Sequence, residues 1–286
     1  MKPQWLNTDE YPFQFRSFRV DNQNMHYIDE GKGDCILFVH GTPSWSFDFR
    51  KIISELSKNN RCIAIDHIGF GLSDKPKHYN YTTQNHSNNL EKFILEKNLE
   101  NITLVAHDFG GPIALNIANK HPHRFKQFII LNTWLWSSEK DPDFQKFRRI
   151  LRSPLLPVLY RYFNFSARFV LPKSFGKKKI SKTMLTNYTR PFSNKNERNG
   201  TIGFVNSLLN DQMWFESIWN NKSGIETKRT LFIWGMSDQF IKPIYLEKFQ
   251  SGFKNSETLK LENCGHFPQE EEPEQVIESI RNWIKQ

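Results

Sequence analysis

One short segment, LVAHDFGG at residues 104–111, carries the residue types of a reactive turn. An apolar run ends there at Asp108, with a small residue two positions before it, Ala106, and another two positions after it, Gly110. A sharp turn from strand to helix needs small residues at those positions because its backbone folds back closely on itself. The pattern is that of a nucleophile elbow with a carboxylate in the place of serine. The plain alternative is an aspartate that only caps a helix over 110–120.

Two more residues that could transfer or hold protons follow apolar runs later in the chain. Asp238 lies in WGMSDQF after the run TLFIWG, and His266 lies in ENCGHFPQ after the next run. Nucleophile, acid and histidine in that chain order are typical of a hydrolase triad. The loop after the first buried run, HGTPSW, is expected to present the backbone N–H of Thr42 to an oxyanion, alongside the N–H of Phe109.

A carboxylate at the elbow predicts displacement at carbon. An aspartate has an ordinary pKa of about 3.9, so at pH 7 it attacks without first losing a proton. Attack on a saturated carbon bearing a leaving group gives an ester of Asp108, and His266 would then activate the water that hydrolyses this ester. Asp238 would orient His266 and stabilise its imidazolium form. The expected partners are a small-molecule substrate and water, with no metal and no organic cofactor.

The elements that position these residues are predicted from periodicity. Residues 13–20 and 24–30 alternate apolar and polar types around DNQN, which indicates a hairpin at a sheet edge. Short apolar runs indicate strands buried on both faces, and they lie at 35–41, 62–69, 102–108, 127–133, 230–235 and 257–263. Helical spacing occurs at 45–58, 82–97, 110–120, 243–250 and 273–285, with Thr82 or Thr83 as a predicted N-cap and Pro273 at the start of the last helix. Alternation of this kind predicts an α/β fold with a mostly parallel sheet covered by helices on both faces.

Residues 134–221 interrupt the alternation. This stretch is rich in aromatic residues, Arg and Lys and contains no buried-strand run, so it is predicted to be an inserted helical cap. The core is then formed by residues 1–133 and 222–286. Because the insertion lies between two strands, it is expected at their carboxyl ends, over the crevice where open α/β sheets bind ligands.

Several stretches together resemble one family. They are HGTPSWSFDFR, DHIGFGLSDKP, VAHDFGGPIAL, YTRPF with RNGTIGF, WGMSDQF and GHFPQEEEPE. With these segments the chain resembles α/β-hydrolases with an aspartate nucleophile, particularly haloalkane dehalogenases, over essentially its whole length. The resemblance implies an α/β-hydrolase fold with a helical cap, and hydrolysis of a carbon–halogen bond in small apolar substrates through an alkyl ester of Asp108.

Two positions depart from the family pattern. Dehalogenases commonly hold the departing halide with a Trp directly after the nucleophile and either an Asn in the first loop or a second Trp from the cap. This chain has Phe109 and Thr42 at the first two of those positions, and a Phe ring offers no N–H. Trp134, Trp136 and Tyr188 are the candidates for replacement contacts to the leaving group or substrate.

Two alternative functions remain open at this point. Epoxide hydrolysis on the same scaffold would use two cap tyrosines to donate O–H groups to the opening oxygen, and Tyr160, Tyr162 and Tyr188 are available. A non-catalytic small-molecule receptor would keep the pocket but would have no need for Asp108, Asp238 and His266 together.

Composition excludes other classes of protein. The 286 residues carry a net charge of +9, but the lysines are dispersed and the densest basic run is only GKKK, which argues against nucleic acid as a partner. No apolar run approaches the roughly 18 residues of a membrane span, and the first residues show no secretory signal pattern, so a cytoplasmic protein without a membrane partner is expected. Cys35 and Cys62 fall in predicted strands, where a reduced thiol packs as a small hydrophobe. The oligomeric state is left undetermined.

Overall fold

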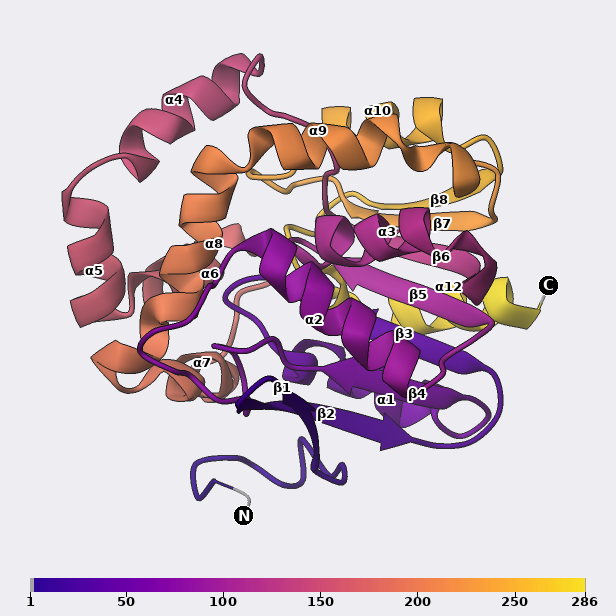
Figure 1. Ribbon diagram of the computed structural model, residues 1–286, viewed down its shortest axis with the longest axis horizontal. Coiled ribbons are helices and arrows are strands. Elements are labelled where there is room, and N and C mark those ends of the chain that lie inside the picture. The colour runs from indigo at the N-terminus through magenta and orange to yellow at the C-terminus, as the bar shows by residue number, and fades with distance from the viewer. Residues whose placement is uncertain (1–2, 286) are drawn as a thin grey trace.

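A single eight-stranded sheet organises the molecule (Figure 1). The computed structural model describes residues 3–285. The strand order is β1-β2-β4-β3-β5-β6-β7-β8. The strands are β1 Arg16–Val20, β2 Gln23–Glu30, β3 Cys35–Val39, β4 Arg61–Ile65, β5 Ile102–His107, β6 Phe125–Leu131, β7 Thr230–Gly235 and β8 Ser256–Leu261.

The sheet is mostly parallel, as predicted. β1 and β2 form the expected antiparallel hairpin at one edge, and β2 pairs antiparallel with β4. All pairs from β4 through β8 are parallel. Every residue of β3, β5 and β7 is buried, which explains why these strands are continuous apolar runs without alternation.

Helices cover both faces of the sheet and create two apolar cores. On one face lie α2 Thr83–Glu96, α3 Gly110–Lys120 and α10 Pro243–Gly252, whose residues Leu90, Ile113 and Phe249 belong to one core cluster. On the other lie α1 Arg50–Leu56 and α12 Pro273–Lys285, which contribute Ile52 and Ile280 to a second cluster. The short helices η1 Ser46–Phe49, η2 Pro122–Arg124 and α11 Pro268–Glu271 complete this part. The predicted α/β layering is therefore confirmed.

Between β6 and β7 the described chain is helical and contains no strand. Its helices are α4 Pro142–Leu151, α5 Leu155–Phe163, α6 Leu171–Ser174, α7 Lys182–Thr189, α8 Asn199–Asn210 and α9 Gln212–Asn220, with shorter turns η3 Ser166–Val170, η4 Arg190–Phe192, η5 Lys195–Arg198 and η6 Lys222–Gly224. Figure 1 shows α4, α5 and α7 at one end of the molecule, beyond the sheet. We call residues 134–221 the cap segment.

Within residues 3–285, every helix is too short or too polar to cross a bilayer.

Thr82 provides a test of the local rules that form α2. Its side-chain oxygen accepts a hydrogen bond from the backbone N–H of Asn85 at 3.3 Å and so satisfies one of the free donors at the helix start. We expect Thr82→Ala to lower the free energy of unfolding by about 1 kcal/mol in urea titrations, whereas Thr82→Ser keeps the cap and changes it little. Equal losses in both variants would contradict the capping role.

Candidate active site

Asp108 lies on a strained turn directly after β5. Its φ is +52°, a left-handed conformation that non-glycine residues rarely adopt and that is typical of a nucleophile elbow. The turn is too tightly packed for larger neighbours. A Cβ on Gly110 would lie 2.1 Å from the carbonyl oxygen of Val39, and a Cβ on Gly41 would lie 2.0 Å from Asp108 Oδ1. The small residues in the sequence are therefore required by close approach of two loops at the carboxyl ends of β3 and β5.

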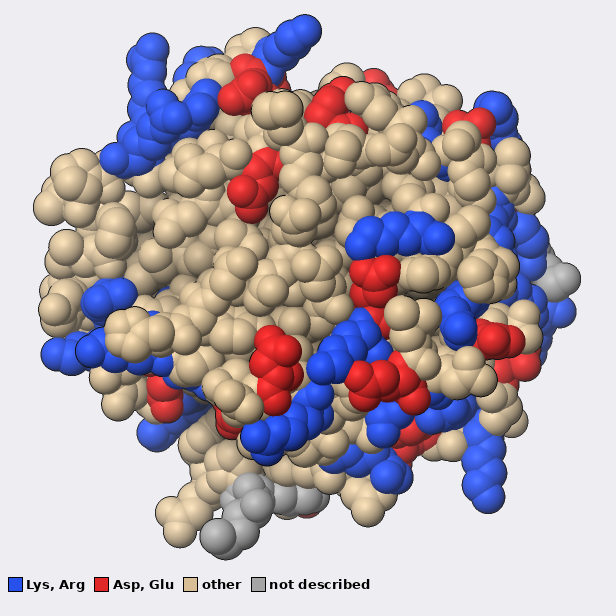
Figure 2. Space-filling view, viewed as in Figure 1, with Lys and Arg blue, Asp and Glu red and all other residues tan. Residues whose placement is uncertain are grey.

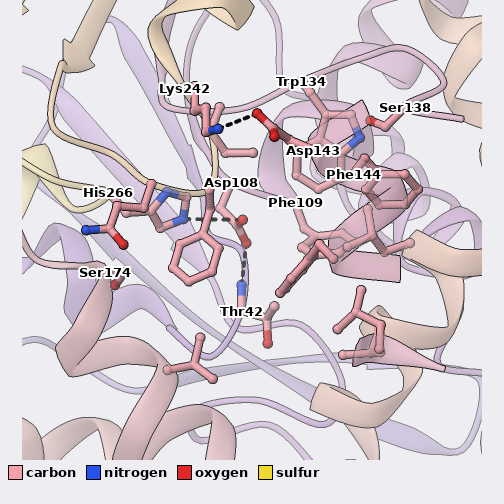
Figure 3. A pocket seen from close by; sticks show the side chains of 18 of the residues that line it. Thr42, Asp108, Phe109, Trp134, Ser138, Asp143, Phe144, Ser174, Lys242 and His266 are labelled. Carbon is pink, nitrogen blue, oxygen red and sulfur yellow. Dashed lines mark hydrogen bonds and ion pairs between the residues drawn. The ribbon is translucent and has the colours of Figure 1, made fainter. Parts of the chain in front are cut away.

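The fold brings the three predicted triad residues together (Figure 3). His266 Nε2 lies 3.4 Å from Asp108 Oδ2, and His266 Nδ1 lies 2.6 Å from Asp238 Oδ2. All three side chains are buried. They come from the loops after β5, β7 and β8, so the parallel sheet places at one edge residues that are up to 158 positions apart in the chain.

Electrostatics in this group favour a charged histidine. Burial alone would lower the pKa of His266, but the charge of Asp238 and the hydrogen-bonding and charge interactions with Asp108 raise it to about 10. For Asp238, burial would raise the carboxyl pKa, but the imidazolium and the N–H groups of Phe240 and Ile241 hold it below its ordinary value. At pH 7 these interactions favour the imidazolium form of His266.

The loop after β3 places a backbone N–H against the carboxylate of Asp108, where an oxyanion donor was predicted. The backbone N–H of Thr42 donates to Asp108 Oδ1 at 2.8 Å, on the oxygen that does not face His266. Phe109, the other expected donor, stands at the N-cap position of α3, where backbone N–H groups are not used by the helix itself. Its donation to Oδ1 remains a prediction.

A cavity of about 510 Å³ opens in front of Asp108. Its wall is mostly apolar, with His266, Thr42 and Asp108 at the inner end. The apolar lining comes from both parts of the chain and includes Phe109, Trp134, Phe144, Phe147, Leu151, Val170, Leu171, Val205, Leu208, Phe240, Ile241 and Phe267. The site can therefore hold a small, apolar molecule next to a carboxylate.

Trp134 is the one replacement contact expected from the sequence that does line this cavity. Its Nε1 is buried and makes no hydrogen bond to any residue in 3–285, as is also true of Thr42 Oγ1. In Figure 3 the indole nitrogen lies on the Ser138 side of the ring. The ring itself packs edge-on against Phe109, with centroids 4.8 Å apart.

The other two expected contacts are corrected by the structure. Trp136 packs outside the cavity against Trp219, Tyr245 and Phe249. Tyr188 is fully buried, and its hydroxyl oxygen lies within hydrogen-bonding distance of two carboxyl groups, 2.9 Å from Asp48 Oδ1 and 2.5 Å from Glu270 Oε1. Both side chains are used in the packing between the cap segment and the core, which periodicity could not distinguish from a place in the pocket.

A family model described as alpha/beta hydrolase fold matches residues 34–273. The chain belongs to this family. Over 283 residues it is 32% identical to a cis-3-alkyl-4-alkyloxetan-2-one decarboxylase of Shewanella oneidensis, covering 96% of this chain and 89% of that protein. It is 30% identical to haloalkane dehalogenase 2 of Mycobacterium tuberculosis, covering 94% of each chain.

Solved structures agree with this assignment. A crystal structure of a haloalkane dehalogenase from Bradyrhizobium elkani superposes with a TM-score of 0.87 at 23% identity, covering 96% of this chain and 98% of that one. At this identity the likeness shows the α/β-hydrolase fold. The family match and the sequence relatives together show that the protein is an enzyme, a haloalkane dehalogenase-like α/β-hydrolase.

Two residues that contact the predicted triad were not predicted from the sequence. Asn132, just after β6, donates from Nδ2 to Asp238 Oδ2 at 2.9 Å and accepts from the N–H of Gly235 at 2.8 Å. His107 Nε2 lies 2.6 Å from the backbone carbonyl oxygen of His266. His107 is the last residue of β5 and Asn132 directly follows β6, and a polar residue at the end of an apolar run is the signal that could have found them.

The raised pKa of His266 predicts how stability depends on pH. A group whose pKa is raised on folding contributes stability that is full below its unfolded value, near 6.5, and is lost as the pH rises toward about 10. We therefore expect the advantage of wild type over His266→Gln in free energy of unfolding to shrink between pH 6.5 and pH 10 in urea titrations. Parallel curves for the two proteins across that interval would contradict the raised pKa.

Proposed function

We propose that this α/β-hydrolase displaces a leaving group from a saturated carbon through a covalent ester of Asp108, as a haloalkane dehalogenase. The geometry of one carboxylate supports this most strongly. Asp108 Oδ1 accepts the N–H of Thr42 while Oδ2 faces His266 and the apolar cavity. One oxygen is thereby assigned to the oxyanion site and the other to attack.

In the first step Oδ2 attacks the substrate carbon as the bond to the leaving group breaks. The carbon–oxygen bond of the ester forms, the leaving group departs with the bonding electron pair, and Asp108 becomes neutral. The apolar cavity favours this step because it takes water away from the nucleophile and holds an alkyl chain against it.

Loss of the Asp108 charge then prepares the second step. Asp108 is one of the groups that raise the pKa of His266, so ester formation lowers that pKa and releases the proton. Neutral His266, oriented by Asp238 at 2.6 Å, can accept a proton from the water that attacks the ester carbon. Collapse of the tetrahedral intermediate, held by the Thr42 N–H, regenerates Asp108 and releases an alcohol.

The ester can be trapped. We expect His266→Gln incubated with 1-bromobutane to gain the mass of one butyl group in intact-mass spectrometry, because alkylation needs no base but hydrolysis does. The adduct should be absent from Asp108→Ala/His266→Gln. Formation of the same adduct without Asp108 would contradict its role as nucleophile.

The indole N–H of Trp134 has no partner among the described residues, and we propose that it turns toward the leaving group when substrate occupies the cavity. Trp134→Phe keeps an aromatic ring but removes the N–H, so we expect the rate of butyl-ester formation to fall about tenfold. Trp136→Phe is the matched control, because that indole packs outside the cavity. If both variants form the butyl ester at the wild-type rate, Trp134 only packs in the cavity wall and does not contact the leaving group.

The epoxide alternative has less support from this cavity. Of the three candidate tyrosines, only Tyr160 lines it, whereas Tyr188 is engaged with Asp48 and Glu270, and Tyr162 is 57% exposed. No pair of those hydroxyls therefore faces Asp108.

The similarity to the oxetan-2-one decarboxylase favours a second candidate. An alkylated oxetan-2-one has a saturated ring carbon whose leaving group is a carboxylate, so the same attack by Asp108 would open the ring. Loss of carbon dioxide would then form a carbon–carbon double bond and expel Asp108, consuming no water. Incubation of His266→Gln with a cis-3,4-dialkyloxetan-2-one separates the candidates, since sustained alkene formation requires no general base whereas dehalogenation stops at the ester.

A further inference from the structure

Charge is strongly segregated along the chain. Between residues 144 and 196 there are thirteen Lys and Arg and not one Asp or Glu. The rest of the chain carries 26 basic and 30 acidic residues, so the whole positive excess resides in the cap segment. The lysines are dispersed, as the sequence suggested, but the acids that would balance them are missing from this stretch.

These cations are at the surface. All thirteen side chains except Arg148 are exposed. Within residues 3–285, no carboxylate pairs with Arg149, Arg152, Arg168 or Lys173 in an ion pair. Figure 2 shows Lys and Arg side chains gathered at the upper left, over α4, while acidic and basic residues are interspersed elsewhere on this face.

The same segment exposes large apolar side chains. Ile150, Leu155, Val158, Tyr162, Phe163 and Phe169 are between 45% and 67% exposed, and we call them the cap patch. In α5, the exposed residues Leu155, Val158 and Tyr162 are spaced as one helix face, while Leu156 and Tyr160 are buried on another. A helix that is apolar on both faces normally has a partner on each.

The residues beneath the cap patch pack together, and one member of the patch also lines the active-site cavity. Leu151 of α4 packs in one cluster with Leu156 and Tyr160 of α5. Phe169 stacks on Phe165, whose ring lies 6.1 Å from that of Tyr160. Ile150 both lines the cavity and is 62% exposed, so the patch adjoins the cavity mouth.

We propose that the cap patch docks on an anionic lipid surface. The exposed apolar side chains enter the boundary between head groups and acyl chains, and the surrounding Lys and Arg contact lipid phosphates. This contact is peripheral, so it needs no membrane-spanning helix, and residues 3–285 contain none. If the proposed function holds, a lipid-dissolved apolar substrate reaches Asp108 through the adjoining mouth.

Charge and shape favour this occupant over others. A second copy of the chain would bring an equally cationic segment against the first, which costs free energy through like-charge repulsion. Nucleic acid would neutralise the cations but would leave Leu155 and Val158 without an apolar partner. Of these three occupants, only a lipid surface offers phosphate groups to the cations and, next to them, hydrocarbon to the apolar side chains.

Vesicle flotation tests the proposal without requiring turnover, so its result is independent of the proposed chemistry. We expect wild type to float with vesicles of equal parts phosphatidylcholine and phosphatidylglycerol, but not with phosphatidylcholine alone, and to bind less as salt is added. Arg149→Gln/Arg152→Gln should weaken binding about twentyfold. Leu155→Gln/Phe163→Gln should weaken it about tenfold.

Two matched variants provide controls. Arg16→Gln/Arg19→Gln removes two exposed charges from β1, and Leu95→Gln/Met213→Gln removes two exposed apolar residues elsewhere, and both should bind like wild type. Equal weakening by test and control variants would overturn the proposal, as would no flotation. A dimer in light scattering that Leu155→Gln/Phe163→Gln dissociates would also overturn it. The same holds for a DNA duplex or an acidic protein that competes with vesicles for the protein and whose binding is unchanged by Leu155→Gln/Phe163→Gln.

Discussion

Every feature of the site depends on the packing of two loops around one carboxylate. Asp108 is held in a left-handed conformation, and its Oδ1 lies where even the Cβ of an alanine at position 41 would collide with it. That closeness brings the Thr42 N–H within 2.8 Å. The strain of the turn is sustained by the buried parallel strands β3 and β5 on which the two loops stand. The buried strands β3 and β5 thus fix the position of the Asp108 carboxylate.

The second dependence is electrostatic. His266 lies between two buried carboxylates, so its charge is set by both, and a reaction at one of them changes its basicity. The charge of His266 and the backbone N–H groups after Asp238 hold the pKa of this carboxyl below its ordinary value. Asn132 donates a hydrogen bond to the same carboxylate oxygen that faces the ring. Asp108 and His266 are therefore coupled through charge, and in the proposed reaction this coupling orders the two steps.

The cap segment differs from the rest of the molecule in charge and in exposed apolar surface. The sheet and its helices carry a slight excess of acid, whereas residues 144–196 carry only base, together with apolar side chains that the core does not cover. The cavity lies between these two parts and takes its lining from both.

The sequence by itself determined the layered α/β architecture, the strand and helix positions within a few residues, and the order of Asp108, Asp238 and His266 at strand ends. These follow from local rules: runs of apolar residues specify buried strands, and small residues around an acid specify a sharp turn. Only the tertiary structure decided that Trp134 lines the cavity while Trp136 and Tyr188 do not, and that Asn132 and His107 support the triad. The physical reason is that the direction of a side chain between two packed layers depends on contacts with residues far away in the chain, such as Tyr188 with Asp48 and Glu270, and periodicity carries no information about those contacts.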